Sequence, residues 1–221
     1  TFSTDTPFTN FKWDVYSVIF DGVDDYISTT ADSTAASKSY SFWAKSTKAS
    51  SNPIFNHGAD SVFMFNFYNA PILWLDASYY LRFVDNAAQD DGNWHHHVVY
   101  VEPDTILNSK WYVDGVAQAL GTSNITASAD AYTSIGIGKG FSDFFDGNLD
   151  EFAIFDGELS AAQVLAIYNG GVPADLSSLS PDAWWRMGDG DYYPTLQDSS
   201  GNDYDGTMTN MSSSKLRADT P

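Results

Sequence analysis

The stretch GNLDEFAIFDGELSAAQVLAIYNGG, residues 147–171, joins a strand pattern to a helix pattern. Residues 148–155 alternate and are rich in aromatic and β-branched types, which indicates a strand. Ser160 is then a suitable N-cap, and Gln163 completes a capping box. An apolar stripe follows, and a glycine pair ends it. We therefore predict a long strand followed by one short helix that must dock on a sheet to persist.

Short strands dominate the rest of the chain. Each predicted strand is rich in β-branched or aromatic residues and is bounded by Gly, Asn, Asp, Pro or Ser. They lie at residues 15–20, 25–30, 39–45, 61–68, 71–77, 79–84, 93–102, 110–115, 132–138 and 148–155. So many short strands separated by turns predict an antiparallel sandwich or barrel.

Composition limits the function classes. With 221 residues, 43% of them hydrophobic, the chain can form one all-β domain with a real core. A formal charge of -19 argues against partners that are polyanions, so we expect no nucleic acid and no anionic membrane surface. The absence of cysteine excludes disulfides and thiolate zinc sites. No apolar run approaches the ~18 residues that span a bilayer, so no membrane insertion is expected.

Five segments in order resemble a laminin-G-like, concanavalin A-like jelly roll. They are VIFDGVDDYIS (18–28), SYSFWAK (39–45), NWHHHVVYV (93–101), KWYVDGV (110–116) and the stretch 147–171. The resemblance implies an all-β, two-sheet antiparallel sandwich whose first and last strands are adjacent. It does not imply one function, because this fold hosts lectins, glycosidases, adhesins and spacers.

The chain is expected to have three parts: an N-terminal arm (1–14), the jelly roll (15–171), and a linker with a C-terminal extension (172–221). In many members of the resembling family, a module like residues 183–207 precedes the first strand, whereas here it follows the helix. Either strand 183–188 folds back on the sandwich, or the extension starts a further repeat. We favour fold-back, because Trp184 and Trp185 are too large and apolar to remain exposed.

Catalysis is not expected. Jelly-roll glucanases typically carry their carboxylates on one strand as E-x-D-x-E, and this triplet is missing. The chain has no cysteine nucleophile and no G-x-S-x-G elbow. We assign no catalytic residue; a glycosidase built from aspartates is the remaining enzymatic alternative.

Aspartate is abundant, and its oxygens suit calcium. The resemblance implies a calcium ion where the first and last strands meet, at positions matching Asp21 and Asp150, with Asp24 or Asp25 completing the site. Alternatively, Asp21 forms a hairpin turn with Gly22 and Asp150 faces water. Glu151 is expected to face solvent or a neighbouring Lys or Arg.

Two weaker metal candidates remain. Asp198, Asn202 and Asp205 have alternating oxygen spacing around Gly201, but turn formation explains them equally well. The histidines at 95–97 suggest zinc. In a strand, however, the first and third point one way and the middle one the other, which leaves the site without a third ligand.

Sugars are recognised by aromatic faces next to hydrogen-bonding groups, and loops on a rigid scaffold usually carry such sites. Two turn-rich segments fit this description, so we predict a glycan site; the alternative is that these aromatics fill the core or a subunit contact. The candidate residues are Asp76, Tyr79, Tyr80, Phe141, Asp143 and Phe144.

The order of modules resembles that of structural proteins of marine bacteriophages. The first hypothesis is therefore a non-catalytic virion surface protein, a head decoration or tail appendage, that contacts other virion subunits or itself and adheres to surface glycans. The alternative is a secreted carbohydrate-binding or adhesin module located outside the cell. A glycosidase comes third.

Overall fold

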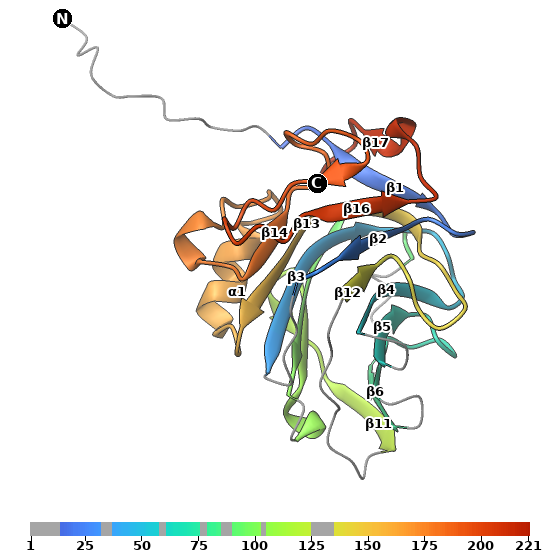
Figure 1. Cartoon of the computed structure of the whole chain (residues 1–221). Helices are drawn as coiled ribbons and strands as arrows, with labels where there is room; N and C mark the ends of the chain where they lie inside the picture. The colour runs from blue at the N-terminus through green and yellow to red at the C-terminus, as the bar shows by residue number, and fades with distance from the viewer. Residues whose placement is uncertain are drawn as a thin grey trace, which may run out of the picture.

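The computed structural model describes residues 14–31, 37–57, 61–75, 79–84, 90–102, 105–124 and 135–221. Two antiparallel sheets face each other across a shared core (Figure 1). This arrangement confirms the predicted jelly-roll sandwich. The first and last strands of the predicted jelly roll are neighbours, since Val18 pairs with Leu149.

The eight-stranded sheet contains, in spatial order, β10 (Val116–Ala117), β9 (Lys110–Val113), β8 (His95–Val101), β3 (Lys38–Lys45), β13 (Asp146–Asp156), β1 (Ser17–Asp21) and β17 (Leu216–Arg217), with β14 (Ala183–Trp185) also paired to β13. The nine-stranded sheet contains β11 (Leu120–Asn124), β7 (Tyr79–Phe83), β6 (Ile72–Leu75), β5 (Ser61–Phe65), β4 (Asn52–His57), β12 (Ile135–Ile137), β2 (Tyr26–Thr29), β16 (Gly206–Thr209) and β15 (Thr195–Leu196). The described residues also contain the 3₁₀ turns η1 (Ile106–Asn108), η2 (Ser177–Leu179) and η3 (Ser213–Lys215).

Aromatic side chains fill the space between the sheets. Along β3, Tyr40 and Phe42 face this core, as the period of two predicts. Phe42 stacks on Phe152 with ring centroids 5.5 Å apart, and Tyr40 stacks on Phe55 at 4.4 Å. Burying a side chain of this size contributes roughly 1.5–3 kcal/mol, so the core accounts for much of the stability of the fold.

The predicted helix is present as α1 (Ala161–Tyr168). The Ser160 hydroxyl accepts a hydrogen bond from the Gln163 backbone N–H, and the Gln163 side-chain oxygen accepts one from the Ser160 backbone N–H, which completes the capping box. Val164 and Ile167 are buried in a second cluster on the outer face of the eight-stranded sheet, where Phe155 also lies. No helix in the described part of the chain is long and apolar enough to cross a membrane.

The C-terminal segment supplies strands to both sheets. Strand β14 pairs with β13, β16 pairs with β2, and β17 pairs with β1 (Figure 1). Trp185 is fully buried and Trp184 is 6% exposed, so both indoles contribute to packing. The segment after α1 thus folds back on the sandwich and brings new side chains to the buried strand β13.

Candidate functional site

Strand β13 contains a bulge at the position of the two adjacent acids. The register with β3 shifts between Asp150 and Ala153, and Glu151 adopts a positive φ of 46°. This backbone conformation is uncommon for a residue other than glycine, and such bulges redirect side chains. As a result both acids are buried, with Asp150 0% and Glu151 4% exposed.

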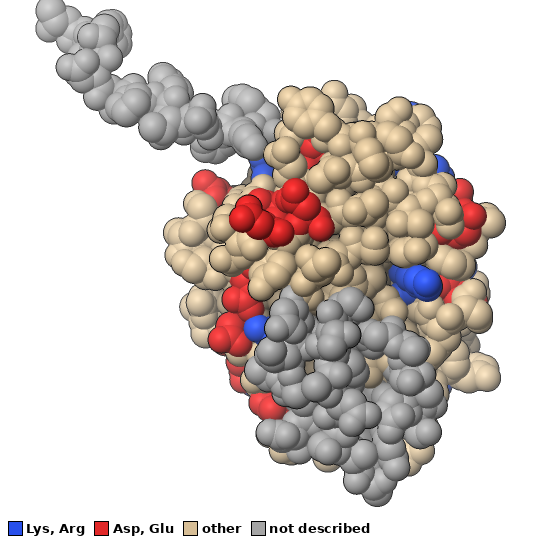
Figure 2. Space-filling view, in the orientation of Figure 1, with Lys and Arg blue, Asp and Glu red and all other residues tan. Residues whose placement is uncertain are grey.

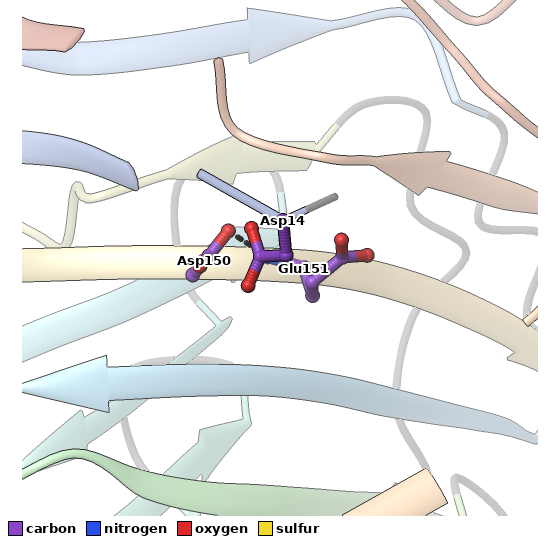
Figure 3. Close-up of side chains that lie close together, drawn as sticks. All are labelled: Asp14, Asp150 and Glu151. Atoms are coloured by element: carbon purple, nitrogen blue, oxygen red, sulfur yellow. Dashed lines mark hydrogen bonds between the residues drawn. The ribbon is translucent and has the colours of Figure 1, made fainter. Parts of the chain in front are cut away.

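A third carboxyl group reaches the same place from the residue just before β1. Oxygen atoms of Asp14, Asp150 and Glu151 lie within 4.8 Å of one another. Figure 3 shows the Asp14 carboxyl between those of the other two residues. Within the described part of the chain, both oxygens of Asp14 and Oδ2 of Asp150 are buried and receive no hydrogen bond. We name this group, together with the neighbouring Asp189, the buried acidic cluster.

Burial and mutual repulsion favour the protonated forms of these acids. Burial, the Asp189 side chain and the charge of Glu151 raise the pKa of Asp14 to about 8. Burial raises the pKa of Glu151 to about 7, although Arg186 and the Trp184 indole oppose this shift. Burial and the charges of Asp14 and Glu151 raise the pKa of Asp150 well above its usual range. The cluster therefore requires protons or a cation near neutral pH.

One guanidinium group partly supplies that positive charge. Arg186 Nε lies 3.1 Å from Glu151 Oε1, and its Nη2 lies 3.7 Å from Asp189 Oδ2. The Trp184 indole donates to the other oxygen of Glu151, and the Val15 N–H donates to Asp189 Oδ2 at 3.0 Å. Glu151 therefore binds a neighbouring arginine, the second of the two expected surroundings, and does not face solvent.

Within the buried acidic cluster, Asp14 and Asp150 have carboxyl oxygens that receive no hydrogen bond. Hard cations such as calcium take 6–8 oxygen ligands from carboxylates, carbonyls and water. Such a cation would bind buried carboxylate oxygens that accept no hydrogen bond. These oxygens therefore fit calcium as ligands. Asp14 and Asp150 are the residues that would hold the ion, with Glu151 already engaged by Arg186.

The structure does not bring Asp21 and Asp25 to this cluster. Asp21 pairs with Asp146, whereas Asp150 lies further along β13, opposite Trp43. Asp21, Asp24 and Asp25 form their own group, in which Lys215 Nζ lies 3.0 Å from Asp21 Oδ2 and 2.5 Å from Asp25 Oδ2. A lysine ammonium supplies the cation there, so the three expected ligands do not form one site.

The contacts of the second candidate metal group are those of a turn. Asp198 accepts hydrogen bonds from the backbone of Trp184, Ser200 and Tyr204. Asp205 Oδ1 accepts the N–H of Asp198 at 2.8 Å, and the Asn202 amide donates to the Asp182 carbonyl at 3.0 Å. These oxygens stabilise the loop after β15, which favours the turn interpretation that the sequence left open.

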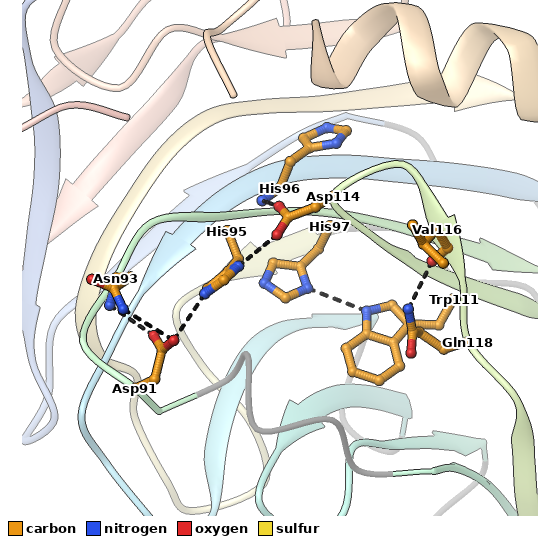
Figure 4. Close-up of polar contacts among 9 residues, drawn as sticks. All are labelled: Asp91, Asn93, His95, His96, His97, Trp111, Asp114, Val116 and Gln118. Atoms are coloured by element: carbon orange, nitrogen blue, oxygen red, sulfur yellow. Dashed lines mark hydrogen bonds and ion pairs between the residues drawn. The ribbon is translucent and has the colours of Figure 1, made fainter. Parts of the chain in front are cut away.

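The three histidines occupy three different environments. His96 and His97 point to opposite sides of β8 (Figure 4). His96 Nε2 contacts Ser41 Oγ at 2.9 Å, whereas His97 receives the Trp111 indole N–H at 3.3 Å in the core. Burial lowers the pKa of His96 to about 3 and that of His97 well below its usual value. His95 pairs with Asp114 and Asp91, so each imidazole has its own structural contact.

A second candidate site lies on the outer face of the nine-stranded sheet. Leu73 and Leu81 point into the core, so the alternating residues Trp74 and Tyr80 point away from it. The Trp74 ring contacts three other aromatic rings, with centroids 5.2 Å from Tyr80, 5.5 Å from Phe67 and 6.0 Å from Phe141. We define the aromatic surface by these members and two that cover its edge: Phe67, Tyr68, Trp74, Tyr80, Arg82 and Phe141.

Arg82 stiffens the edge of this surface. Its guanidinium carbon lies 5.6 Å from the ring centroids of both Tyr68 and Tyr80, in the range of a cation–π contact. Tyr68 is 78% exposed and Phe141 is 42% exposed, so rings remain open to solvent. On the face drawn in Figure 2, acidic side chains gather in patches and basic side chains are few and separate.

Two of the predicted glycan residues, Tyr80 and Phe141, meet at Trp74. Asp143 is exposed in the loop that carries Phe141, and Phe144 packs near Tyr26 at 6.4 Å, away from Trp74. Asp76 and the side chain of Tyr79 lie outside the described residues. Sequence reasoning missed Trp74 and Arg82. The alternation between core-facing and outward-facing residues in β6 and β7 is the signal that could have found them.

Solved structures with this fold differ widely in sequence. A protein from Bacteroides ovatus described as carbohydrate binding matches with a TM-score of 0.63 and 14% identity, over 92% of this chain and 60% of that chain. A heptameric SAP-like pentraxin from Limulus polyphemus gives 0.52 and 13%, over 72% of this chain and 85% of that chain. Domain 4 of the arabinanase AbnA from Geobacillus stearothermophilus, solved with arabinotriose, gives 0.51 and 20%, over 69% and 76%. These likenesses show the fold.

This chain spans less than two thirds of the Bacteroides ovatus chain. No curated protein sequence matches it significantly. The family model Laminin_G_3, described as the concanavalin A-like lectin/glucanases superfamily, matches residues 21–165, which is more than half of the chain. The two-sheet sandwich, the strand pairing of β1 with β13 and this match agree, and the chain belongs to the Laminin_G_3 family of concanavalin A-like lectin/glucanase domains.

Proposed function

We propose that this chain is a non-catalytic carbohydrate-binding domain that contacts glycans through the aromatic surface. The observation that carries the proposal is the ring cluster around Trp74 on an outer sheet face, in which Trp74 and Tyr80 are partly buried and Tyr68 and Phe141 are exposed. The C–H faces of sugar rings pack on aromatic rings, while neighbouring polar groups bond the hydroxyls. Exposed apolar clusters of this kind usually mark an interaction site.

The related structures support this ligand class. The Bacteroides ovatus protein is described as carbohydrate binding, and the arabinanase domain is in complex with arabinotriose. Trp74, Tyr80 and Phe141 come from different segments of the chain and are fixed by contacts with one another, so the surface is formed before a ligand arrives. Such pre-organisation reduces the entropy lost on binding.

The acid groups support a binding role over catalysis. A glycosidase needs two carboxyl groups that flank the bond to be cleaved. Asp14, Asp150 and Glu151 lie close together, but Asp150 and Glu151 are at most 4% exposed and Glu151 binds Arg186. This group is therefore enclosed in the fold and does not offer a reaction centre to a polymer.

The experiment is a polysaccharide panel that includes arabinan, measured by affinity electrophoresis and calorimetry. Trp74→Ala should weaken binding at least 10-fold, because it removes the ring that contacts the others. Tyr192→Ala is the matched control, since Tyr192 is 78% exposed but belongs to the C-terminal segment. Equal weakening by both variants, or release of reducing sugar from the polymer, would contradict the proposal.

The buried acidic cluster adds a metal to the proposal. Calcium held by Asp14 and Asp150 would neutralise the excess charge and tie the residue before β1 to β13. Its role is structural, because the cluster is enclosed. Because the pKa values of Asp14 and Asp150 are raised, these acids hold protons near neutral pH when no metal is bound. The cation would replace those protons.

We propose the virion surface as the place of action, with an extracellular carbohydrate-binding or adhesin module as the alternative. The support is the order of sequence modules, which resembles that of marine bacteriophage structural proteins. On a particle, this domain would contact other subunits or copies of itself while the aromatic surface meets glycans. Purification of phage particles distinguishes the two locations. A virion protein should remain with the particles at fixed stoichiometry, whereas a secreted module would stay in the supernatant.

A further inference from the structure

A cavity of about 360 Å³ lies away from both candidate sites, and none of its lining residues belongs to the aromatic surface or the buried acidic cluster. It is formed where the end of β8, the β9–β10 hairpin and the edge strand β11 meet. Both sheets contribute, since β9 belongs to the eight-stranded sheet and β11 to the nine-stranded one. The polar lining includes Tyr100, Glu102, Asn108, Lys110, Gln118 and Glu158.

Several of these polar groups are already held in place. The Tyr100 hydroxyl donates to Glu102 Oε2 at 2.5 Å, and Lys110 Nζ donates to Glu158 Oε1 at 2.5 Å. The Gln118 amide donates to the Val116 carbonyl at 2.8 Å, as Figure 4 shows. Among the contacts of the described residues, these bonds leave one oxygen of each glutamate and the Gln118 carbonyl as open acceptors.

The charge of the lining selects among ligands. Two carboxylates face one ammonium group, so the cavity carries an excess negative charge and disfavours carboxylate or sulfate groups. Its open acceptors require a ligand rich in donors, and sugar hydroxyls are such donors. Leu107 and Leu120, 53% and 42% exposed, add apolar contact for the C–H groups of a ring.

We infer that this cavity binds a single neutral sugar unit, at a second site separate from the aromatic surface. Its volume is at the small end of the range for ligand pockets, about 300–1,000 Å³, which suits one ring and a few bridging waters. The inference takes its ligand class from the proposed carbohydrate-binding function, but its residues are independent of that surface. The two sites would let one domain hold a chain end in the cavity and a polymer on the sheet.

The test uses the full 221-residue chain and NMR titration with D-glucose, D-galactose and L-arabinose. At least one of these sugars should shift the resonances of Lys110 and Gln118, and Glu102→Gln should weaken that binding at least 10-fold. Gln118→Ala, which removes an acceptor from a partly exposed side chain, should also weaken it, and both variants must keep the wild-type melting temperature. Should Glu102→Gln fail to fold, Gln118→Ala alone decides.

The outcomes separate the two proposals. Trp74→Ala should leave the binding of single sugars at Lys110 and Gln118 unchanged while polymer binding falls. If no neutral sugar shifts these resonances but polymers still bind through Trp74, the cavity inference is wrong and the proposed function stands. Stronger shifts with D-glucuronate or D-glucosamine than with neutral sugars would overturn the ligand class.

Discussion

The carboxyl groups of Asp14 and Asp150 lie within 4.8 Å of each other, although Asp14 precedes the first strand and Asp150 sits in the middle of β13. Burial removes the water that would screen two negative charges, so their repulsion is large at such a distance. The contact therefore makes the stability of the sandwich depend on what neutralises the pair. The predictions below on calcium, on Asp150→Asn and on pH follow from this relationship.

Calcium should stabilise the protein. A ligand that binds only the folded state at 100 times its Kd raises the free energy of unfolding by about 2.7 kcal/mol. For a domain of this length that corresponds to a rise in melting temperature of roughly 5–10 °C. Thermal unfolding in calcium and in EDTA measures the difference, with magnesium as the comparison ion because it fits such sites less readily.

Asp150→Asn should abolish this calcium effect, because it removes one of the two acids with oxygens to spare. The amide is similar in shape to the acid, so the packing should survive. Asp198→Asn is the matched control, since Asp198 accepts turn hydrogen bonds outside the cluster. Identical melting curves of the wild-type protein in calcium and in chelator would remove the metal from the cluster.

The metal-free protein should lose stability as the pH rises from about 4 to 8. The pKa values of Asp14 and Glu151 are raised to about 8 and about 7, so the folded state retains protons that the unfolded chain releases. When the native state binds more protons, the free energy of unfolding falls with increasing pH. The full contribution is present below the unfolded pKa values near 4 and is lost as the pH passes the folded values.

Calcium should flatten that pH dependence, because it binds the deprotonated carboxylates. Chemical denaturation at pH 5, 6, 7 and 8, with calcium and with EDTA, gives both curves. Asp150→Asn should flatten the metal-free curve as well, since it removes one acid whose pKa is raised. A metal-free wild-type protein that becomes more stable between pH 5 and 8 would contradict these protonation states.

The fold could be predicted from sequence because its signals are local and numerous. Residues 39–45 were predicted as a strand, which is present as β3, and the capping box located α1. Strand β4 was missed because its sequence NPIFNH begins with turn formers and contains a proline. Strand β16 was missed because GTMT follows a run of turn residues and forms only by pairing with β2.

The candidate sites could be predicted only in part, because they depend on contacts between distant segments. The sequence identified Asp150, but its partner Asp14 lies in the expected arm, and no local pattern links the two. A bulge buries Glu151, and strand periodicity cannot show where a bulge falls. Tyr80 and Phe141 were predicted as glycan-binding residues. Their common neighbour Trp74 could not be predicted, because its contacts with them depend on how the strands pair in the sheet.

Arg186→Leu should destabilise the metal-free protein by about 3 kcal/mol, because removing one member of a buried ion pair leaves the other charge uncompensated. Arg186 is 6% exposed and is the guanidinium that contacts Glu151 and Asp189. The loss should be smaller in saturating calcium, which supplies positive charge to the same cluster. Urea denaturation measures it, and an equal loss with and without calcium would show that the metal does not act on this charge.

Lys215→Met should also destabilise the protein, by about 1–2 kcal/mol, because Asp25 is fully buried and Lys215 provides its charged partner. The lysine side chain itself is 21% exposed, so water moderates the loss. Lys45→Met is the matched control: both side chains of the Lys45–Asp219 pair are open to solvent in part, at 32% and 43%, and such pairs contribute about 0–1 kcal/mol. Calcium should not change the effect of Lys215→Met, since this acid group is separate from the buried acidic cluster. Urea denaturation of both variants provides the comparison, and an equal loss in the two would contradict the role given to Asp25.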